Sequence, residues 1–335
     1  MTSKLTRRTF VRSAAAVALA SAAEGGTSAT TGASAQSAKG PLVYLDYDQP
    51  ALDAAYDQSV WAPNVDRVRA QRGAAIEAAL SRLGEPERLP YGPTEFERLD
   101  LYETDRANAP IHIFIHGGAW RGGNGFGRAA HRAEVFVRSG AHFIAPDYVL
   151  VQDAEGSLFP MVEQLRRAVV WAYQNAASFG GDSNRIYLSG HSAGGHLAGV
   201  LLVTDWLKRF DVPADIVKGG LCASGMFDLF PVSLSSRREY VAFNDQMIEA
   251  LSPLRHLDKL NAQVVVSYGT AESPEFQRQS REFAQALANA GKRVELLVGE
   301  GYNHFEIQET LANPLGLLGY AALEQMGLTW SLRAQ

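Results

Sequence analysis

Hydrophobic and polar residues have two different spacings along this chain, one typical of strands and one typical of helices. Segments with the two spacings alternate. Short apolar runs that predict strands fall near residues 97–103, 110–116, 141–146, 185–190, 217–223, 263–268 and 293–299. Longer segments with helical spacing fall near residues 127–139, 160–178, 193–207, 234–250, 274–290 and 309–325, and another at 48–84 precedes the first strand. This alternation predicts an α/β fold with a mostly parallel sheet flanked by helices.

The most informative motif is a serine between glycines at one strand-to-helix junction. Gly190–Gly194 read G-H-S-A-G, after the strand-like run 185–189 and before a helix-like run that starts at Gly195. A serine on such a sharp turn has a strained backbone and needs small neighbours. The following helix directs its free N–H groups and its positive dipole end toward an oxyanion. This context predicts a nucleophile at Ser192 rather than an incidental serine in a glycine-rich turn.

A serine nucleophile needs a base and an acid that orients the base, and on this kind of turn they follow in the order serine, acid, histidine. His256 and His304 come well after the serine. His304 lies in a loop after the last predicted strand, from which a base can reach over the sheet edge. We therefore expect His304 to be the base and His256 to make a surface hydrogen bond.

Three carboxylates are candidates for the acid. Glu272 stands in the loop after the buried run 263–268, which is the position expected for the orienting carboxylate. Glu275 falls in the first turn of the next helix, where the helix dipole stabilises a negative charge. Asp228 follows the preceding predicted strand and is the alternative. We predict Glu272 as the acid.

The oxyanion hole is predicted in the loop after the strand-like run 111–115. Gly117 and Gly118 follow His116 there, and glycines let the backbone turn its N–H groups toward a substrate. Together with the N–H of Ala193 they would supply two or three donors. His116 itself is expected to be a structural hydrogen-bonding residue. Substrate contacts are expected from the aromatic residues Trp120, Phe126 and Tyr302.

With these motifs the chain resembles the α/β-hydrolase superfamily, in its hormone-sensitive-lipase-like esterase branch. Glu272–Phe276, Arg278–Ser280 and His304–Ile307 resemble the kynurenine formamidase (arylformamidase) subgroup, in which an aspartate usually stands at the position of Glu272. The resemblance implies an eight-stranded type of sheet, and the helical pattern before the first strand predicts a small cap at residues 46–90. The resemblance also implies a serine hydrolase that cleaves a small carboxylic ester or aryl formamide through an acyl-enzyme intermediate.

The first residues predict export. Arg7 and Arg8 precede a short alanine-rich segment, and Ala33–Ala35 fit a small-x-small cleavage site, so residues 1–35 resemble a twin-arginine signal peptide. The apolar segment is too short to span a membrane. We expect a linker at 36–45, a single domain at 46–335, passage through the twin-arginine (Tat) machinery and a periplasmic or secreted product. An exported location favours esterase over formamidase activity.

The composition favours small molecules as the ligands of this protein. The formal charge is −5, which argues against nucleic acid and anionic membranes. Cys222 is the single cysteine, so no intrachain disulfide can form. We expect no cofactor, because the glycines near Gly123 fail the dinucleotide pattern, and no metal, because no H-E-x-x-H or Cys/His spacing occurs. A non-catalytic binding protein on a hydrolase scaffold, or an amidase or peptidase of the same fold, remains the alternative.

Overall fold

The computed structural model describes residues 40–329, so the predicted signal peptide, its cleavage site and the start of the linker lie outside the described residues. No helix among residues 40–329 is long and apolar enough to cross a membrane.

Eight strands of the described part form one sheet, in the order β10-β9-β8-β7-β5-β6-β4-β3. Pairing is parallel from β10 to β6, whereas β4 pairs antiparallel with both β6 and β3. The mostly parallel eight-stranded sheet of the predicted α/β-hydrolase fold is therefore confirmed. The strands are β3 (Glu87–Pro90), β4 (Arg98–Tyr102), β5 (Ala109–Ile115), β6 (His142–Pro146), β7 (Gly181–His191), β8 (Val217–Ala223), β9 (Gln263–Gly269) and β10 (Val294–Gly299).

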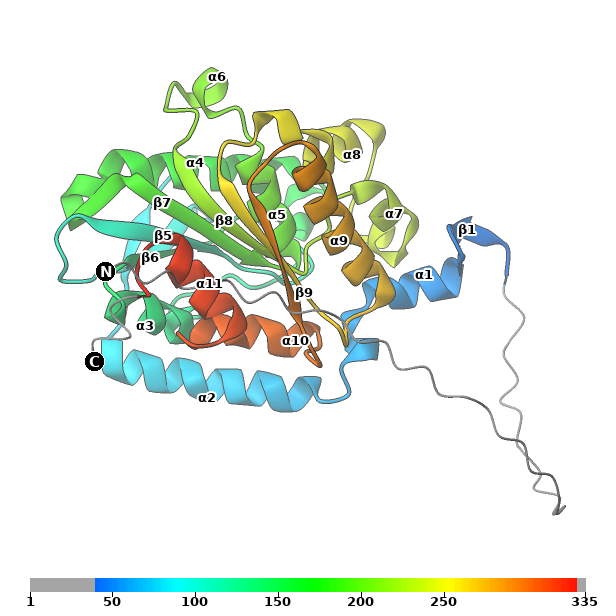
Figure 1. Cartoon of the computed structure of the whole chain (residues 1–335), viewed down its shortest axis with the longest axis horizontal. Helices are drawn as coiled ribbons and strands as arrows, with labels where there is room; N and C mark the ends of the chain where they lie inside the picture. The colour runs from blue at the N-terminus through cyan, green and yellow to red at the C-terminus, as the bar shows by residue number, and fades with distance from the viewer. Residues whose placement is uncertain (1–39, 330–335) are drawn as a thin grey trace, which may run out of the picture. The chain divides into compact units, whose positions relative to one another are not determined.

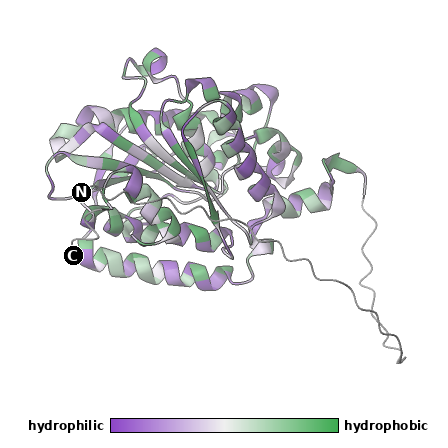
Figure 2. Ribbon diagram, viewed as in Figure 1, coloured by the Kyte–Doolittle hydropathy of each residue, from purple (hydrophilic) through white to green (hydrophobic). Residues whose placement is uncertain are grey.

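Helices cover both faces of this sheet (Figure 1). The longer ones are α2 (Val65–Leu83), α3 (Ala130–Arg138), α4 (Phe159–Asn175), α5 (Ala193–Leu202), α9 (Pro274–Asn289) and α11 (Leu317–Gln325). The shorter ones are α1 (Gln49–Tyr56), α6 (Trp206–Phe210), α7 (Leu229–Leu234), α8 (Asp245–Leu251) and α10 (His304–Ile307). In Figure 2 the flanking helices carry both hydrophilic and hydrophobic residues along their length, as expected for helices with one buried face.

The core has two layers because side chains alternate along each strand. Val264 and Val266 of β9 pack into the layer under α4, α5 and α9, whereas Val265 between them packs into the layer under α3 and α11. A strand that is buried on both faces has a continuous run of apolar residues, which explains why β9 could be predicted from the sequence. This burial fixes the ends of β7 and β9, from which the candidate active-site loops emerge.

Some predicted elements differ from the structure at the periphery. Leu42–Tyr44, expected within the linker, form strand β1, which pairs antiparallel with β2 (Tyr47–Asp48). Residues 87–90, expected within the helical cap, form the edge strand β3. The helix expected at 309–325 is a 3₁₀ segment followed by α11, because the chain turns at Asn313–Gly316.

Candidate active site

Ser192 lies where β7 ends and α5 begins, with φ 60° and ψ −125°. A positive φ is rare for a residue with a side chain and marks local strain. A Cβ on Gly190 would lie 2.1 Å from the carbonyl oxygen of Gly194, and a Cβ on Gly194 would lie 2.1 Å from that of Ile115. Both glycines are therefore required by close backbone contacts, and the turn predicted around Ser192 is present.

The structure brings Glu272 and His304 together from two loops. Glu272 follows β9 and His304 opens α10 after β10, and Nδ1 of the imidazole lies 3.3 Å from Oε1 of the carboxylate. The hydroxyl of Ser224 donates to the same oxygen at 2.6 Å. Asn303 caps α10 and holds the start of the helix that carries His304. The Glu272 carboxylate faces Nδ1, which is the imidazole nitrogen that the acid of a Ser-His-acid triad contacts.

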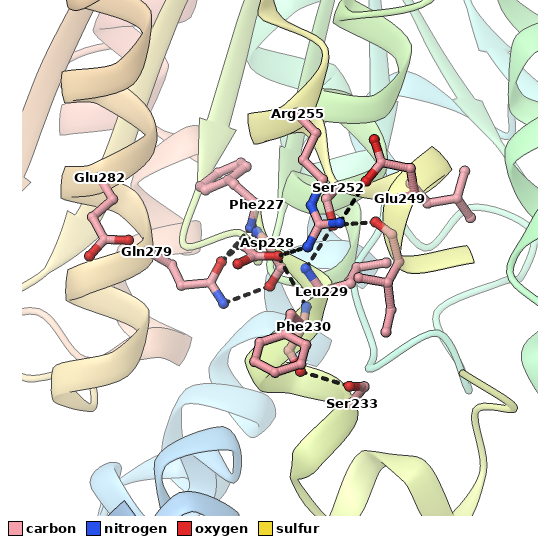
Figure 3. Close-up of polar contacts among 12 residues, drawn as sticks. Phe227, Asp228, Leu229, Phe230, Ser233, Glu249, Ser252, Arg255, Gln279 and Glu282 are labelled. Atoms are coloured by element: carbon pink, nitrogen blue, oxygen red, sulfur yellow. Dashed lines mark hydrogen bonds and ion pairs between the residues drawn. The ribbon is translucent and has the colours of Figure 1, made fainter. Parts of the chain in front are cut away.

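Asp228, the alternative acid, is engaged elsewhere (Figure 3). Its side chain accepts from the N–H of Phe230 as the N-cap of α7, and it lies 3.3 Å from the guanidinium of Arg255. The amide of Gln279 bonds the backbone on both sides of this turn. The Asp228 carboxylate therefore has a structural role at the start of α7.

The other histidines match the roles expected of them. His256 is half-buried and bonds the carbonyl of Glu249 at 2.7 Å. His116 bonds Asn124 at 2.5 Å and stacks on Tyr148 with ring centroids 4.3 Å apart, and burial lowers its pKa. Neither side chain contacts Glu272, so His304 is the histidine placed to act as a base.

His191, inside the serine motif, packs directly against His304. The two ring centroids are 4.3 Å apart, and Phe276 meets the His304 ring edge-on at 4.9 Å. Burial, followed by the neighbouring His304, lowers the pKa of His191 well below its usual value. A neutral His191 gives His304 a packed neighbour that does not compete for protons at neutral pH. Nothing in the sequence pattern indicated this contact.

One group among residues 40–329 has ligand atoms close enough for a metal ion. It consists of His191, Glu272 and His304, whose nitrogen and oxygen atoms lie within 4.8 Å of one another. Imidazole and carboxylate are ligand types that zinc accepts. A metal there would occupy the imidazole and carboxylate atoms that a serine triad needs. The two mechanisms therefore exclude each other, and chelation can separate them.

The loop after β5 lies against the serine turn. A Cβ on Gly117 would lie 2.6 Å from the carbonyl oxygen of His191 and 3.2 Å from Cβ of Ser192. Gly118 has φ +118°, which favours glycine, and a Cβ there would lie 2.3 Å from the carbonyl of Gly122. Ala193 is the first residue of α5. The loop and the helix start thus bring the backbone of the three predicted oxyanion residues close to Ser192.

Ser192, His304 and Gly117 line one cavity of about 490 Å³. Residues 56–59 and α2 supply part of its wall. Gln58 of the N-terminal segment is buried and bonds Ser273, the residue after Glu272, at 2.9 Å. The segment preceding the sheet is therefore part of the fixed wall of this cavity.

The three predicted aromatic substrate contacts lie outside the wall of this cavity. Trp120 is fully buried and donates its indole N–H to His196 at 3.3 Å. Phe126 and Tyr302 are exposed, and neither is among the lining residues. The position of an aromatic residue close to a site motif in the sequence was weak evidence for a substrate contact, because proximity in sequence does not fix the direction of a side chain.

The chain matches known families along most of its length. The BD-FAE family model matches residues 99–220, and the prolyl oligopeptidase family model matches residues 167–313. A kynurenine formamidase from Danio rerio is 33% identical over 293 residues, which cover 82% of this chain and 96% of that protein. This chain belongs to the kynurenine formamidase family. A second family member, from Salmo salar, is 30% identical over 302 residues, covering 85% of this chain and 98% of that protein.

The fold is that of the α/β-hydrolase superfamily. The crystal structure of the esterase LipW from Mycobacterium marinum has a TM-score of 0.63, with 17% identity, and covers 84% of this chain and 95% of its own. At this identity the likeness shows the fold alone.

Proposed function

We propose that this chain is a serine hydrolase that removes a small acyl group, formyl or a short carboxylic acyl group, from an aryl amine or an alcohol. The observation that carries the proposal is the contact of His304 with Glu272 beside a serine held at positive φ, with base and serine in one cavity. Membership of the kynurenine formamidase family supports formamides as substrates beside small esters.

The proposed reaction begins when Oγ of Ser192 attacks the carbonyl carbon and His304 takes the hydroxyl proton. The Glu272 carboxylate orients the imidazole and stabilises its charged form. The backbone N–H groups of Gly117, Gly118 and Ala193 would hold the oxyanion, each typically contributing about 2.7–4 kcal/mol.

His304 then gives its proton to the leaving nitrogen or oxygen as the bond to the carbonyl carbon breaks. A water molecule, deprotonated by the same imidazole, attacks the acyl-enzyme and releases formate or a short carboxylic acid. The proton returns to Oγ of Ser192, so the enzyme ends the cycle as it began.

Location is a separate part of the proposal. The paired arginines and the alanine-rich segment of residues 1–35 support export by the twin-arginine route to the periplasm or beyond. A fusion of residues 1–40 to a reporter that is active only after folded export would test this. Substituting Arg7 and Arg8 by lysines should then retain the reporter in the cytoplasm.

The assignment of the nucleophile is tested with Ser192→Ala. A fluorophosphonate probe should label the wild-type protein and leave the variant unlabelled, and turnover should fall on the order of 10⁶-fold. A labelled variant, or one with substantial activity, would contradict the assignment. Activity that EDTA removes and zinc restores would instead indicate the metal mechanism at His191, Glu272 and His304.

Glu272→Gln and Asp228→Asn form a matched pair for the acid. Glu272→Gln should lower kcat by about 10⁴-fold, because the amide no longer stabilises the charged imidazole. Asp228→Asn should leave kcat close to that of the wild type and affect only the start of α7. The reverse result would show that Asp228, after β8, is the acid and that Glu272, after β9, is not.

A panel of substrates separates the chemical classes. Rates for p-nitrophenyl acetate, butyrate and octanoate should be compared with those for the formamide of kynurenine and for a peptide p-nitroanilide. We expect the formamide and the acetate to be hydrolysed fastest, and octanoate to be the slowest of the esters. Fastest hydrolysis of the peptide substrate would favour the peptidase alternative, since the prolyl oligopeptidase family model matches residues 167–313.

A further inference from the structure

Arginine side chains dominate the charged part of the cavity that contains Ser192. Among residues 40–329, its lining includes Arg69, Arg72, Arg128, Arg132 and Arg237. The carboxylates of the lining are Asp57 and Asp147, and Asp147 is already paired with Arg88. Asp66 outside the lining faces Arg69 at 3.6 Å. The whole protein has a formal charge of −5, so this excess of cations is local.

Two of these arginines share one carboxylate. Nε of Arg72 lies 2.7 Å from Oε1 of Glu309, and Nη2 of Arg132 lies 3.1 Å from the same oxygen. The adjacent His131 adds no charge at neutral pH, because burial lowers its pKa to about 4. Arg132 is only 4% exposed, and burial lowers its pKa to about 10. Two guanidinium groups against one carboxylate leave a net positive charge beside the cavity.

Arg237 has no carboxylate partner among the described residues. Its guanidinium donates to the Tyr240 hydroxyl at 2.8 Å and to the Tyr56 carbonyl at 2.9 Å, and lies 5.5 Å from the centroid of the Trp120 ring. These contacts orient the cation without neutralising it. The side chain is 7% exposed and its Nε has no hydrogen-bond partner. A buried, unpaired charge is costly to keep, so a counter-charge supplied by a ligand would compensate it.

Arg128, at the rim of the same cavity, is exposed and has no carboxylate partner among the described residues. An exposed guanidinium is well hydrated and does not need a partner for stability. It can therefore meet an incoming anion without breaking an existing ion pair, and its replacement should disturb the fold little.

We infer that Arg237 and Arg128 are the residues that select an ester or formamide with a carboxylate over a neutral one in this cavity. The inference rests on the proposed function, because it names the residues that select the substrate of the same serine. Guanidinium groups match carboxylates in geometry as well as in charge. A charge-assisted hydrogen bond of this kind raises the specificity for the anion on the order of tenfold to a hundredfold.

Matched pairs of esters test the inference. The compounds 3-acetoxybenzoate and its methyl ester lose the same acetyl group and differ in the charge of the leaving group. The compounds p-nitrophenyl hemisuccinate and p-nitrophenyl methyl succinate differ in the charge of the acyl group. For the wild type we expect kcat/KM for the anion to exceed that for its neutral partner by about tenfold or more in one pair. Arg237→Gln should bring this ratio toward one, and Arg128→Gln should lower it in part.

Arg281→Gln is the control, because Arg281 is exposed on α9 outside the cavity and should leave the ratio unchanged. Melting curves show whether Arg237→Gln folds, and Arg128→Gln carries the test if it does not. Neutral esters hydrolysed in a Ser192-dependent way, with no preference for anions, would overturn this inference and leave the proposed function intact. A preference that neither variant changes would overturn the role of these arginines. Failure to hydrolyse any ester or formamide would overturn both proposals.

Discussion

Acidification is expected to destabilise this fold through three buried histidines that are held neutral. Burial lowers the pKa of His112 to about 3, and burial is also the main cause of pKa values of about 4 for His131 and His196. The contacts of His196 show the physical reason. Its Nε2–H donates to the Leu251 carbonyl at 2.8 Å, while Nδ1 accepts the indole N–H of Trp120. A second ring proton would point at that indole hydrogen.

The magnitude follows from proton linkage. A histidine in the unfolded chain titrates near about pH 6.5, so the unfolded state binds the proton first as the pH falls. The stability is complete above about pH 6.5 and is lost progressively toward the lower pKa values of the folded state. At about 1.36 kcal/mol per pH unit, each histidine removes about 2 kcal/mol between pH 6.5 and 5. Three together remove about 6 kcal/mol, a large part of a typical stability of about 5–15 kcal/mol.

Urea unfolding followed by tryptophan fluorescence at several pH values between about 7 and 5 measures this loss. His112→Gln should lose about 2 kcal/mol less than the wild type over the same pH interval, whatever its stability at neutral pH. His256→Gln is the control, because His256 is only half-buried and bonds the Glu249 carbonyl and Lys259 at the surface. Equal losses in the wild type and in His112→Gln, or a rise in stability on acidification, would refute the reasoning.

The remaining predictions concern the backbone and the wall of the site. Gly117→Ala should lower kcat by about a hundredfold or more, because the added Cβ would lie 2.6 Å from the His191 carbonyl. Gly73→Ala in α2 should keep its activity, because an added Cβ would have no atom within 4 Å. Its free energy of unfolding should rise by about 0.5–1 kcal/mol. An active Gly117→Ala in steady-state assays would show that the loop can move. Gln58→Ala should lose about 1–3 kcal/mol in urea unfolding and lower kcat, because it loses its bond to Ser273; an unchanged kcat would show that this bond does not position the acid.

The central sheet could be predicted because burial on both faces leaves continuous apolar runs, as in β9. The edge strand β3 could not, since its four residues include a glutamate, an arginine and a proline and only two are even half-buried. An edge strand is held by backbone pairing with one neighbour, here β4, and that pairing leaves little trace in the pattern of side chains.

The contact between Glu272 and His304 was predictable because β9 and β10, which precede these residues, are consecutive in the chain and also neighbours in the sheet. β9 and β10 are parallel neighbours, so the loops that follow them leave the same edge of the sheet. The arginine lining was not predicted, because its members come from α2, from the chain around α3 and from the segment after α7. The one local signal is the spacing of Arg69 with Arg72 and of Arg128 with Arg132, which suits one face of a helical turn.

The N-terminal segment bonds both loops that carry Glu272 and His304, which we propose as the acid and the base. Gln58 bonds Ser273 beside Glu272, and Asn64 bonds Asn303 at 2.8 Å, next to His304. The bond between Gln58 and Ser273 is buried, and the bond between Asn64 and Asn303 is partly buried, so opening the segment would break both of them. A part of the chain that lies before the sheet in sequence therefore fixes the distance between two loops that follow different strands. Residues 56–59 of the same segment also belong to the wall of the cavity that contains Ser192, so the segment that bonds the two loops shapes that cavity as well.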